Sequence, residues 1–193
     1  MQHKHKAVRY FVFGQASLFL SISICIFLLP EGIFANDGIS YYSAYKLTAL
    51  PYAAGLLLTA LFSYKVAGSL PEKAPRAMAR AFKLISFMLV AIAVVPYGID
   101  FVVEYTHTIL SALLFLIQFL IVWWLAFRVR ADIISLLLLV LMAAEMIFSV
   151  MYLTPRKGYL IFGELAFQIT FAVAAYRFII YTVEQSASRG RSS

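Results

Sequence analysis

The chain has 193 residues, of which 63% are hydrophobic and 13% are charged. Soluble domains are about 45–50% apolar and about 25% charged, so this balance excludes an ordinary soluble protein and indicates a membrane protein. The net charge is +7, but the basic residues are spread through short segments beside apolar runs, which is typical of membrane topology. Nucleic acid is therefore not an expected partner.

Six apolar runs follow one another along the chain. Each is close to the roughly 20 residues that a helix needs to cross a hydrocarbon core about 30 Å thick. They lie at about 9–30, 46–67, 79–99, 106–127, 132–153 and 159–182. Their continuous hydrophobicity excludes the alternating strands of a barrel. The prediction is an all-α polytopic bundle of six transmembrane helices, forming one domain over residues 1–185, with a disordered cytoplasmic tail at 186–193.

The positions of lysine and arginine predict the orientation. Most of these residues precede the first run or lie near the segments that follow the second, fourth and sixth runs: Lys4, Lys6, Arg9, Lys65, Lys73, Arg76, Arg80, Lys83, Arg128, Arg130, Arg189 and Arg191. The other connecting segments contain only Lys46, Arg156 and Lys157. By the positive-inside rule, we expect an N-in/C-in protein of the cell membrane, with both termini in the cytoplasm.

The first two runs each carry a row of small and polar residues at helical spacing. The rows are Gly14, Ser17, Ser21 and Cys25 on the first run, and Thr48, Tyr52, Gly55, Thr59 and Ser63 on the second. Small residues let membrane helices approach closely, so we interpret both rows as packing faces. Because Cys25 is the one cysteine, an intramolecular disulfide and a cysteine-based metal cluster are excluded. No metal or cofactor is expected.

The last three runs carry the polar residues that point most directly to a site. These are His107, Ser111 and Gln118 on the fourth run, Glu145 and Tyr152 on the fifth, and Glu164 and Gln168 on the sixth. Each set shares one helix face, and the tight connection between the last two runs puts Glu145 and Glu164 at similar depth. We expect the three faces to meet inside the bundle, in the outer half of the bilayer.

The two intramembrane carboxylates have two interpretations. A charged carboxylate facing lipid is costly, so Glu145 and Glu164 predict either a function or a buried contact. In the functional interpretation they line a polar cavity that binds a cation, exchanges protons or holds the polar head of an amphiphile. In the structural one they are protonated and bonded to Gln118, Gln168 or Tyr152, which fixes the helix register.

His107 lies beside Asp100 and Glu104 and could supply a proton-transfer group or one metal ligand. A lone histidine does not make a metal site, so an ordinary interfacial histidine is the favoured interpretation. The sequence contains no G-x-S-x-G, H-E-x-x-H or P-loop motif. Nothing therefore identifies hydrolytic or nucleotide-driven chemistry.

Three short motifs carry a family resemblance. They are Gly38-Ile39-Ser40-Tyr41, the segment from His107 to Ala112 with Phe115 after it, and Glu164. In these motifs the chain resembles the DRAM/FRAG/SFK superfamily of six-helix membrane proteins and its prokaryotic relatives, over nearly its whole length. The resemblance implies handling of membrane lipids or lipid anchors, or modulation of a partner, and not a defined reaction.

Three functions are compatible with these patterns. The leading hypothesis is a non-enzymatic protein that binds a lipid, another amphiphile or a partner helix in a polar pocket in the outer half of the bilayer. The alternative is a small proton- or cation-coupled transporter that uses Glu145 and Glu164. The third is an intramembrane lipid-modifying enzyme with His107 and a carboxylate as its acid–base pair. Membrane lipids are the expected partners, with a protein partner or a homo-oligomer left open.

Overall fold

The computed structural model describes residues 5–35, 37–98, 100–129, 131–152 and 160–188, without the side chains of 150–152 and 187–188. The described part consists of helices and their connections, with no strand, which confirms the all-α prediction for these residues. The elements are α1 (Lys6–Leu28), η2 (Pro30–Phe34), η3 (Gly38–Ser43), α2 (Lys46–Ser69), α3 (Arg76–Val94), α4 (Phe101–Arg128), α5 (Ile133–Tyr152) and α6 (Leu160–Ser188).

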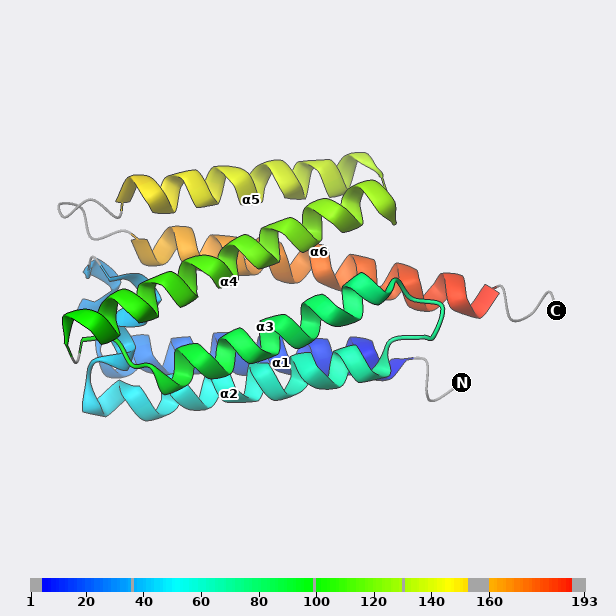
Figure 1. The fold of residues 1–193 in the computed structure, drawn as a ribbon. Coiled ribbons are helices and arrows are strands. Elements are labelled where there is room, and N and C mark those ends of the chain that lie inside the picture. Colours follow the sequence, from blue (N-terminus) through cyan, green and yellow to red (C-terminus); the bar gives the residue numbers. More distant parts are fainter. Residues whose placement is uncertain (1–4, 36, 99, 130, 153–159, 189–193) are drawn as a thin grey trace.

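The six α-helices run alternately in opposite directions along one bundle (Figure 1). The start of α1 and the end of α6 lie at one end of the bundle, and the short 3-10 helices η2 and η3 lie at the other. Helix α6 contacts α1, α4, α5 and η3, so it is the central element of the fold. The bundle therefore places η3 where it can cover one end of the interior.

The surface of the bundle is strongly apolar. Helices α1, α2, α3, α4 and α6 are long and apolar enough to cross a membrane, and α5 contributes a shorter apolar helix at Ile133–Ser149. On α5, Leu137 is 62% exposed, Val140 65% and Ile147 63%. Exposed apolar area on this scale is unfavourable in water and favourable in lipid. The protein is therefore a multi-pass membrane protein.

Several helix ends differ from the predicted ones, and two of the differences have clear local reasons. Helix α3 ends at Val94 and not at residue 99, because Pro96 has no N–H to donate and restricts the backbone of the residue before it. Helix α4 starts at Phe101, before the predicted residue 106, since the Asp100 carboxylate accepts a hydrogen bond of 2.9 Å from the Val103 N–H and caps the helix.

The predicted tail was wrong in its first residues. Helix α6 continues to Ser188, so residues 186–188, which the sequence placed in a disordered tail, belong to the last helix. The remaining predicted tail, 189–193, lies outside the described residues.

The polar rows on the first two helices pack against each other, as predicted. The Thr59 hydroxyl lies 3.1 Å from the Gly14 carbonyl oxygen of α1 and 2.7 Å from the Gly55 carbonyl oxygen of its own helix. A Cβ atom at Gly55 would lie only 2.3 Å from the Ser21 hydroxyl oxygen. Small residues permit this approach, so the two helices pack closely at these positions, while Tyr52, Thr59 and Ser63 of the second row also line a cavity.

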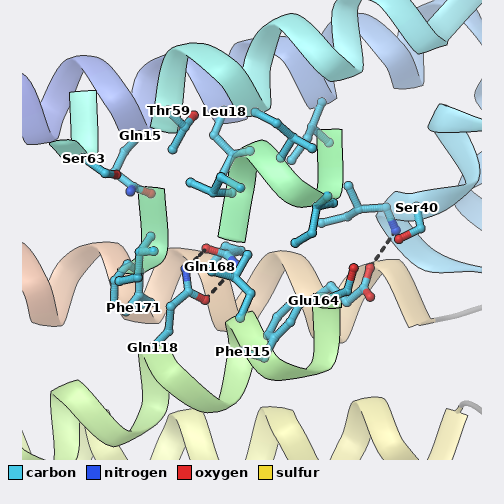
Figure 2. Close-up of a pocket in the computed structure, with 18 of the residues that line it drawn as sticks. Gln15, Leu18, Ser40, Thr59, Ser63, Phe115, Gln118, Glu164, Gln168 and Phe171 are labelled. Atoms are coloured by element: carbon cyan, nitrogen blue, oxygen red, sulfur yellow. Dashed lines mark hydrogen bonds between the residues drawn. The ribbon is translucent and has the colours of Figure 1, made fainter. Parts of the chain in front are cut away.

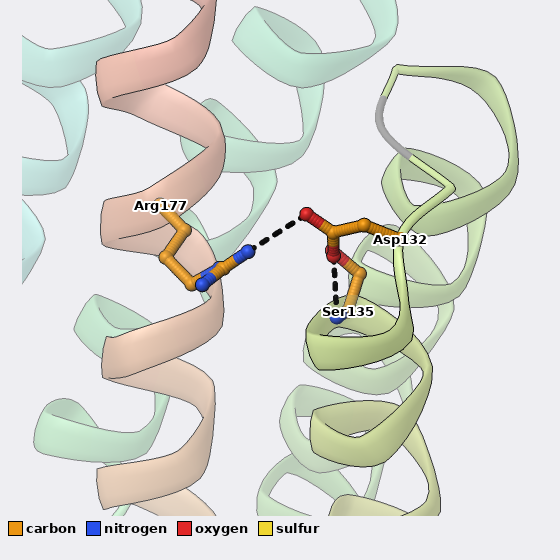
Figure 3. Close-up of polar contacts among 3 residues, drawn as sticks. All are labelled: Asp132, Ser135 and Arg177. Carbon is orange, nitrogen blue, oxygen red and sulfur yellow. Dashed lines mark hydrogen bonds and ion pairs between the residues drawn. The ribbon is translucent and has the colours of Figure 1, made fainter.

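The start of α5 is fixed to α6 by one aspartate (Figure 3). One oxygen of Asp132 accepts a hydrogen bond of 2.8 Å from the Ser135 N–H, and the other accepts one of 2.9 Å from the Arg177 guanidinium. The side chains of Arg177 and Asp132 are only 22% and 28% exposed, so solvent screens this ion pair weakly. Asp132 therefore caps α5 and orients it on the central helix.

Candidate functional site

A cavity of about 50 Å³ lies inside the bundle, between η3 and helices α1, α2, α3, α4 and α6. This volume accommodates a few water molecules or a small polar group. Most of its wall is aliphatic or aromatic. The polar wall residues are Gln15, Ser40, Tyr52, Thr59, Ser63, Ser111, Gln118, Glu164 and Gln168.

The polar groups are distributed along the cavity (Figure 2). Glu164 and Ser40 lie at the end covered by η3, whereas Gln15 and Ser63 lie at the opposite end, and Gln118 and Gln168 lie between them. The Gln15 side-chain oxygen is buried and has no hydrogen-bond partner among the described residues. Each end of the cavity therefore offers a side-chain oxygen that can accept a hydrogen bond.

Glu164 is held by the backbone of η3. The Ile39 N–H donates a hydrogen bond of 2.6 Å to the Glu164 carboxylate (Figure 2). The preceding residue, Gly38, has φ +59, and a Cβ atom there would lie 2.2 Å from the same carboxylate oxygen. Glycine is required at this position both for the left-handed backbone and for the close approach of the carboxylate. The arrangement fixes η3 over the cavity.

His107 provides a second anchor for η3. Its side chain is 0% exposed, its Nδ1 contacts the Val95 carbonyl oxygen, and its Nε2 lies 2.9 Å from the Ser40 hydroxyl. We assign the neutral tautomer in which Nδ1–H donates to the Val95 carbonyl and Nε2 accepts from the Ser40 hydroxyl, because this gives both ring nitrogens a hydrogen-bond partner. The ring is buried against η3 and the end of α3, and the prediction of an ordinary interfacial histidine stays a prediction. His107 does not line the cavity.

Tyr97 provides a third anchor. Its N–H donates a hydrogen bond of 2.8 Å to the Ser43 hydroxyl, and its own hydroxyl lies 2.9 Å from both Asp37 and Glu104. Burial, together with these two carboxylates, raises the pKa of Tyr97, so the phenol stays protonated and ties the loop to α4. Among the described residues, no three His, Cys, Asp or Glu side chains converge to form a metal site.

Glu145 lies elsewhere in the bundle. Its carboxylate accepts a hydrogen bond of 2.9 Å from the Thr170 hydroxyl of α6, and its second oxygen is buried with no partner among the described residues. Glu145 is not a cavity wall residue, although Glu164 is. The site was expected between the last three runs. The cavity lies elsewhere, because α5 contributes no wall residue whereas α1, α2 and α3 do.

Four of the predicted site residues therefore come together at the cavity, namely Ser111, Gln118, Glu164 and Gln168. Of the other three predicted site residues, His107 and Glu145 do not line the cavity. The side chain of Tyr152 lies outside the described residues.

No family model, curated protein or solved structure matches this chain. The resemblance to the DRAM/FRAG/SFK superfamily therefore stays a prediction, and the functional inference below depends on the geometry of the cavity.

A reciprocal amide pair crosses the middle of the cavity wall. Gln118 of α4 and Gln168 of α6 each donate to the other, at 3.2 and 3.1 Å, and both are nearly fully buried (Figure 2). Each amide satisfies one donor and one acceptor of its partner. The pair therefore holds α4 against α6 beside Glu164.

We predict that this pair is non-additive in stability. Gln118→Leu and Gln168→Leu should each destabilise the protein by about 1–2 kcal/mol, because each leaves a buried amide unpaired. The double variant should be no less stable than the worse single variant, since no orphaned amide remains. Unfolding in detergent, followed by circular dichroism, measures all three. Strictly additive losses would show that the two amides do not depend on each other.

Proposed function

We propose that this protein is a non-enzymatic integral membrane protein that holds the small polar head of a single-chain amphiphile taken from the membrane lipids. The head donates hydrogen bonds, as a primary amine or a hydroxyl does. The observation that carries the proposal is the Glu164 carboxylate, fixed by the Ile39 N–H on the wall of a mainly apolar cavity. A carboxylate in such surroundings favours a cationic or hydrogen-bond-donating ligand.

The wall chemistry and the volume support this ligand class. Glu164 at one end and the unpaired oxygen of Gln15 at the other are both acceptors, and a carboxylate repels an anionic head. A cavity of roughly 150 Å³ holds benzene in another protein, whereas this one has about 50 Å³. It suits an ammonium or hydroxyl group with its first carbons, which the aliphatic wall at Leu18, Ile22 and Leu89 would contact. A phosphodiester head is too large and has the wrong charge.

We also propose that all six α-helices cross the cell membrane, with both termini in the cytoplasm. The end of the bundle where α1 begins and α6 ends also carries the α2–α3 connection (Figure 1), and the lysines and arginines concentrate in these segments. By the positive-inside rule this end faces the cytoplasm. The end with η3 and Glu164 then faces outward, so the Glu164 end of the cavity lies in the outer half of the bilayer. The superfamily resemblance implies a lipid-related function of the same kind.

The orientation predicts the outcome of a fusion experiment in bacteria. Alkaline phosphatase, which is active only outside the cytoplasm, should be active when fused after Gly98 or Pro155 and inactive when fused after Pro75. The Pro155 fusion tests specifically whether α5 crosses the membrane. Activity after Pro75 and none after Gly98 would contradict the orientation.

The ligand class predicts selective binding by matched amphiphiles. In nanodiscs, the protein should bind dodecylamine or dodecanol more tightly than lauric acid, which has the same chain length and an anionic head. Glu164→Gln should weaken binding of the amine by about 10-fold, which corresponds to about 1.4 kcal/mol for the lost charge-assisted contact. Equilibrium dialysis against empty nanodiscs separates binding by the protein from partitioning into lipid.

Glu145→Gln is the matched control, because Glu145 is also an intramembrane carboxylate but does not line the cavity. It should change the affinity for the amine by less than about 2-fold. Preference for lauric acid, or an equal effect of the two variants, would contradict the proposal. Proton or cation flux into liposomes that Glu145→Gln abolishes would instead indicate a transporter.

A further inference from the structure

A second pocket lies at the end of the bundle opposite η3. Its volume is about 310 Å³. Its wall joins the α2–α3 connection, the end of α4 and the last turns of α6, through Lys73, Arg128, Thr182, Gln185 and Ser186 together with Pro75 and Val129. In the predicted orientation this pocket faces the cytoplasm, at the level of the lipid headgroups.

The pocket has an unneutralised positive charge. Lys73 and Arg128 line it from different elements, and its wall contains no carboxylate. Within the part of the chain that the structure describes, neither cation forms an ion pair. An arginine supplies a planar fork of donors and a lysine a compact charge, and the two together suit a tetrahedral oxyanion.

The α6 side of the pocket adds a neutral hydrogen-bond donor. Thr182 is 5% exposed, and among the described residues its hydroxyl donates only to the weakly accepting Met78 sulfur, at 4.0 Å. A stronger acceptor in the pocket, such as a phosphate oxygen, would displace this contact. The pocket therefore combines two cations with a hydroxyl on a third element.

We propose that Lys73 and Arg128 bind a phosphate group in this pocket, either a monoester or a diester. The phosphate can belong to the headgroup of an anionic lipid or to a soluble phosphate compound, and both present the same charged oxygens. Basic pockets between helices on the cytoplasmic side of membrane proteins recognise phosphorylated headgroups in this way. The proposal is independent of the Glu164 cavity, which lies at the other end of the bundle and disfavours anions.

The test uses the full chain in phosphatidylcholine nanodiscs, with phosphatidic acid as the lipid probe and inorganic phosphate as the soluble one. Binding of fluorescently labelled phosphatidic acid should weaken by about 10-fold or more in the double variant Lys73→Gln/Arg128→Gln. Lys83→Gln is the matched control, because Lys83 is an exposed cation of α3 that does not line the pocket. It should change the affinity by less than about 2-fold.

The two sources of phosphate give different results. If inorganic phosphate does not compete with the labelled lipid, the site takes a lipid headgroup; if it binds and displaces the lipid, the site takes soluble phosphate. Both results support a phosphate site, provided that the double variant loses the binding. Equal binding of either probe by the wild-type protein, the double variant and Lys83→Gln would overturn the proposal, as would no binding of either probe to the wild-type protein.

Discussion

Gly38→Ala should destabilise the protein by about 3 kcal/mol, because the left-handed backbone costs a non-glycine residue roughly 1–2 kcal/mol and a lost charged hydrogen bond costs a similar amount. Gly38 has φ +59, and the new Cβ atom would lie 2.2 Å from the Glu164 carboxylate. The carboxylate must therefore move away from the Ile39 N–H. Denaturation in detergent, followed by circular dichroism, measures the loss.

Gly68→Ala is the matched control for this substitution. Gly68 lies in α2, and a Cβ atom there meets nothing within 4 Å. Alanine is favoured over glycine inside a helix by about 1 kcal/mol, so this variant should be at least as stable as the wild-type protein. If both variants have the same stability, Gly38 does not support the Glu164 carboxylate as described.

His107→Leu should be the second most damaging change. Leucine removes both ring nitrogens and leaves the Val95 carbonyl and the Ser40 hydroxyl without the partners they have now. An unpaired buried polar group costs about 1–3 kcal/mol, so we expect a loss of about 2–3 kcal/mol in unfolding free energy. The amides of η3 should also exchange hydrogen faster, because one of its anchors is gone.

The neighbouring threonine serves as the control for His107. Thr108 is exposed, and among the described residues its hydroxyl bonds only to the Glu104 carbonyl oxygen one turn earlier in the same helix. Thr108→Val should change stability by less than about 0.5 kcal/mol and leave exchange in η3 unaltered. Unchanged exchange of η3 in His107→Leu would mean that the histidine does not anchor this segment.

The helices could be predicted from the sequence because each depends on a local pattern. Apolar runs give their number and approximate length, and the small residues at Gly14, Gly55 and Thr59 give the packing face between α1 and α2. Helix ends were less predictable. Helix α4 starts where Asp100 caps it. In the sequence, a capping aspartate in an acidic loop looks the same as a solvated one.

The site was only partly predictable, because its main contact is not local. The Glu164 carboxylate meets a backbone N–H of Ile39, and a backbone group has no signature in the sequence. The available signals were the Gly38-Ile39-Ser40-Tyr41 motif and Glu164 itself, and a glycine before Ile39 permits both the left-handed backbone and a close approach. Helical periodicity also could not show that Glu164 lines the cavity and Glu145 does not. Which carboxylate reaches the cavity depends on the rotation of α5 against α6.

Native mass spectrometry of the protein after gentle removal of bulk lipid tests the central claim most directly. We expect the wild-type protein and Glu145→Gln to retain one single-chain amine or alcohol per chain, and Glu164→Gln to lose it. If the wild-type protein retains no such molecule, or if Glu164→Gln retains the same molecule to the same extent, the cavity is not the amphiphile site that we propose.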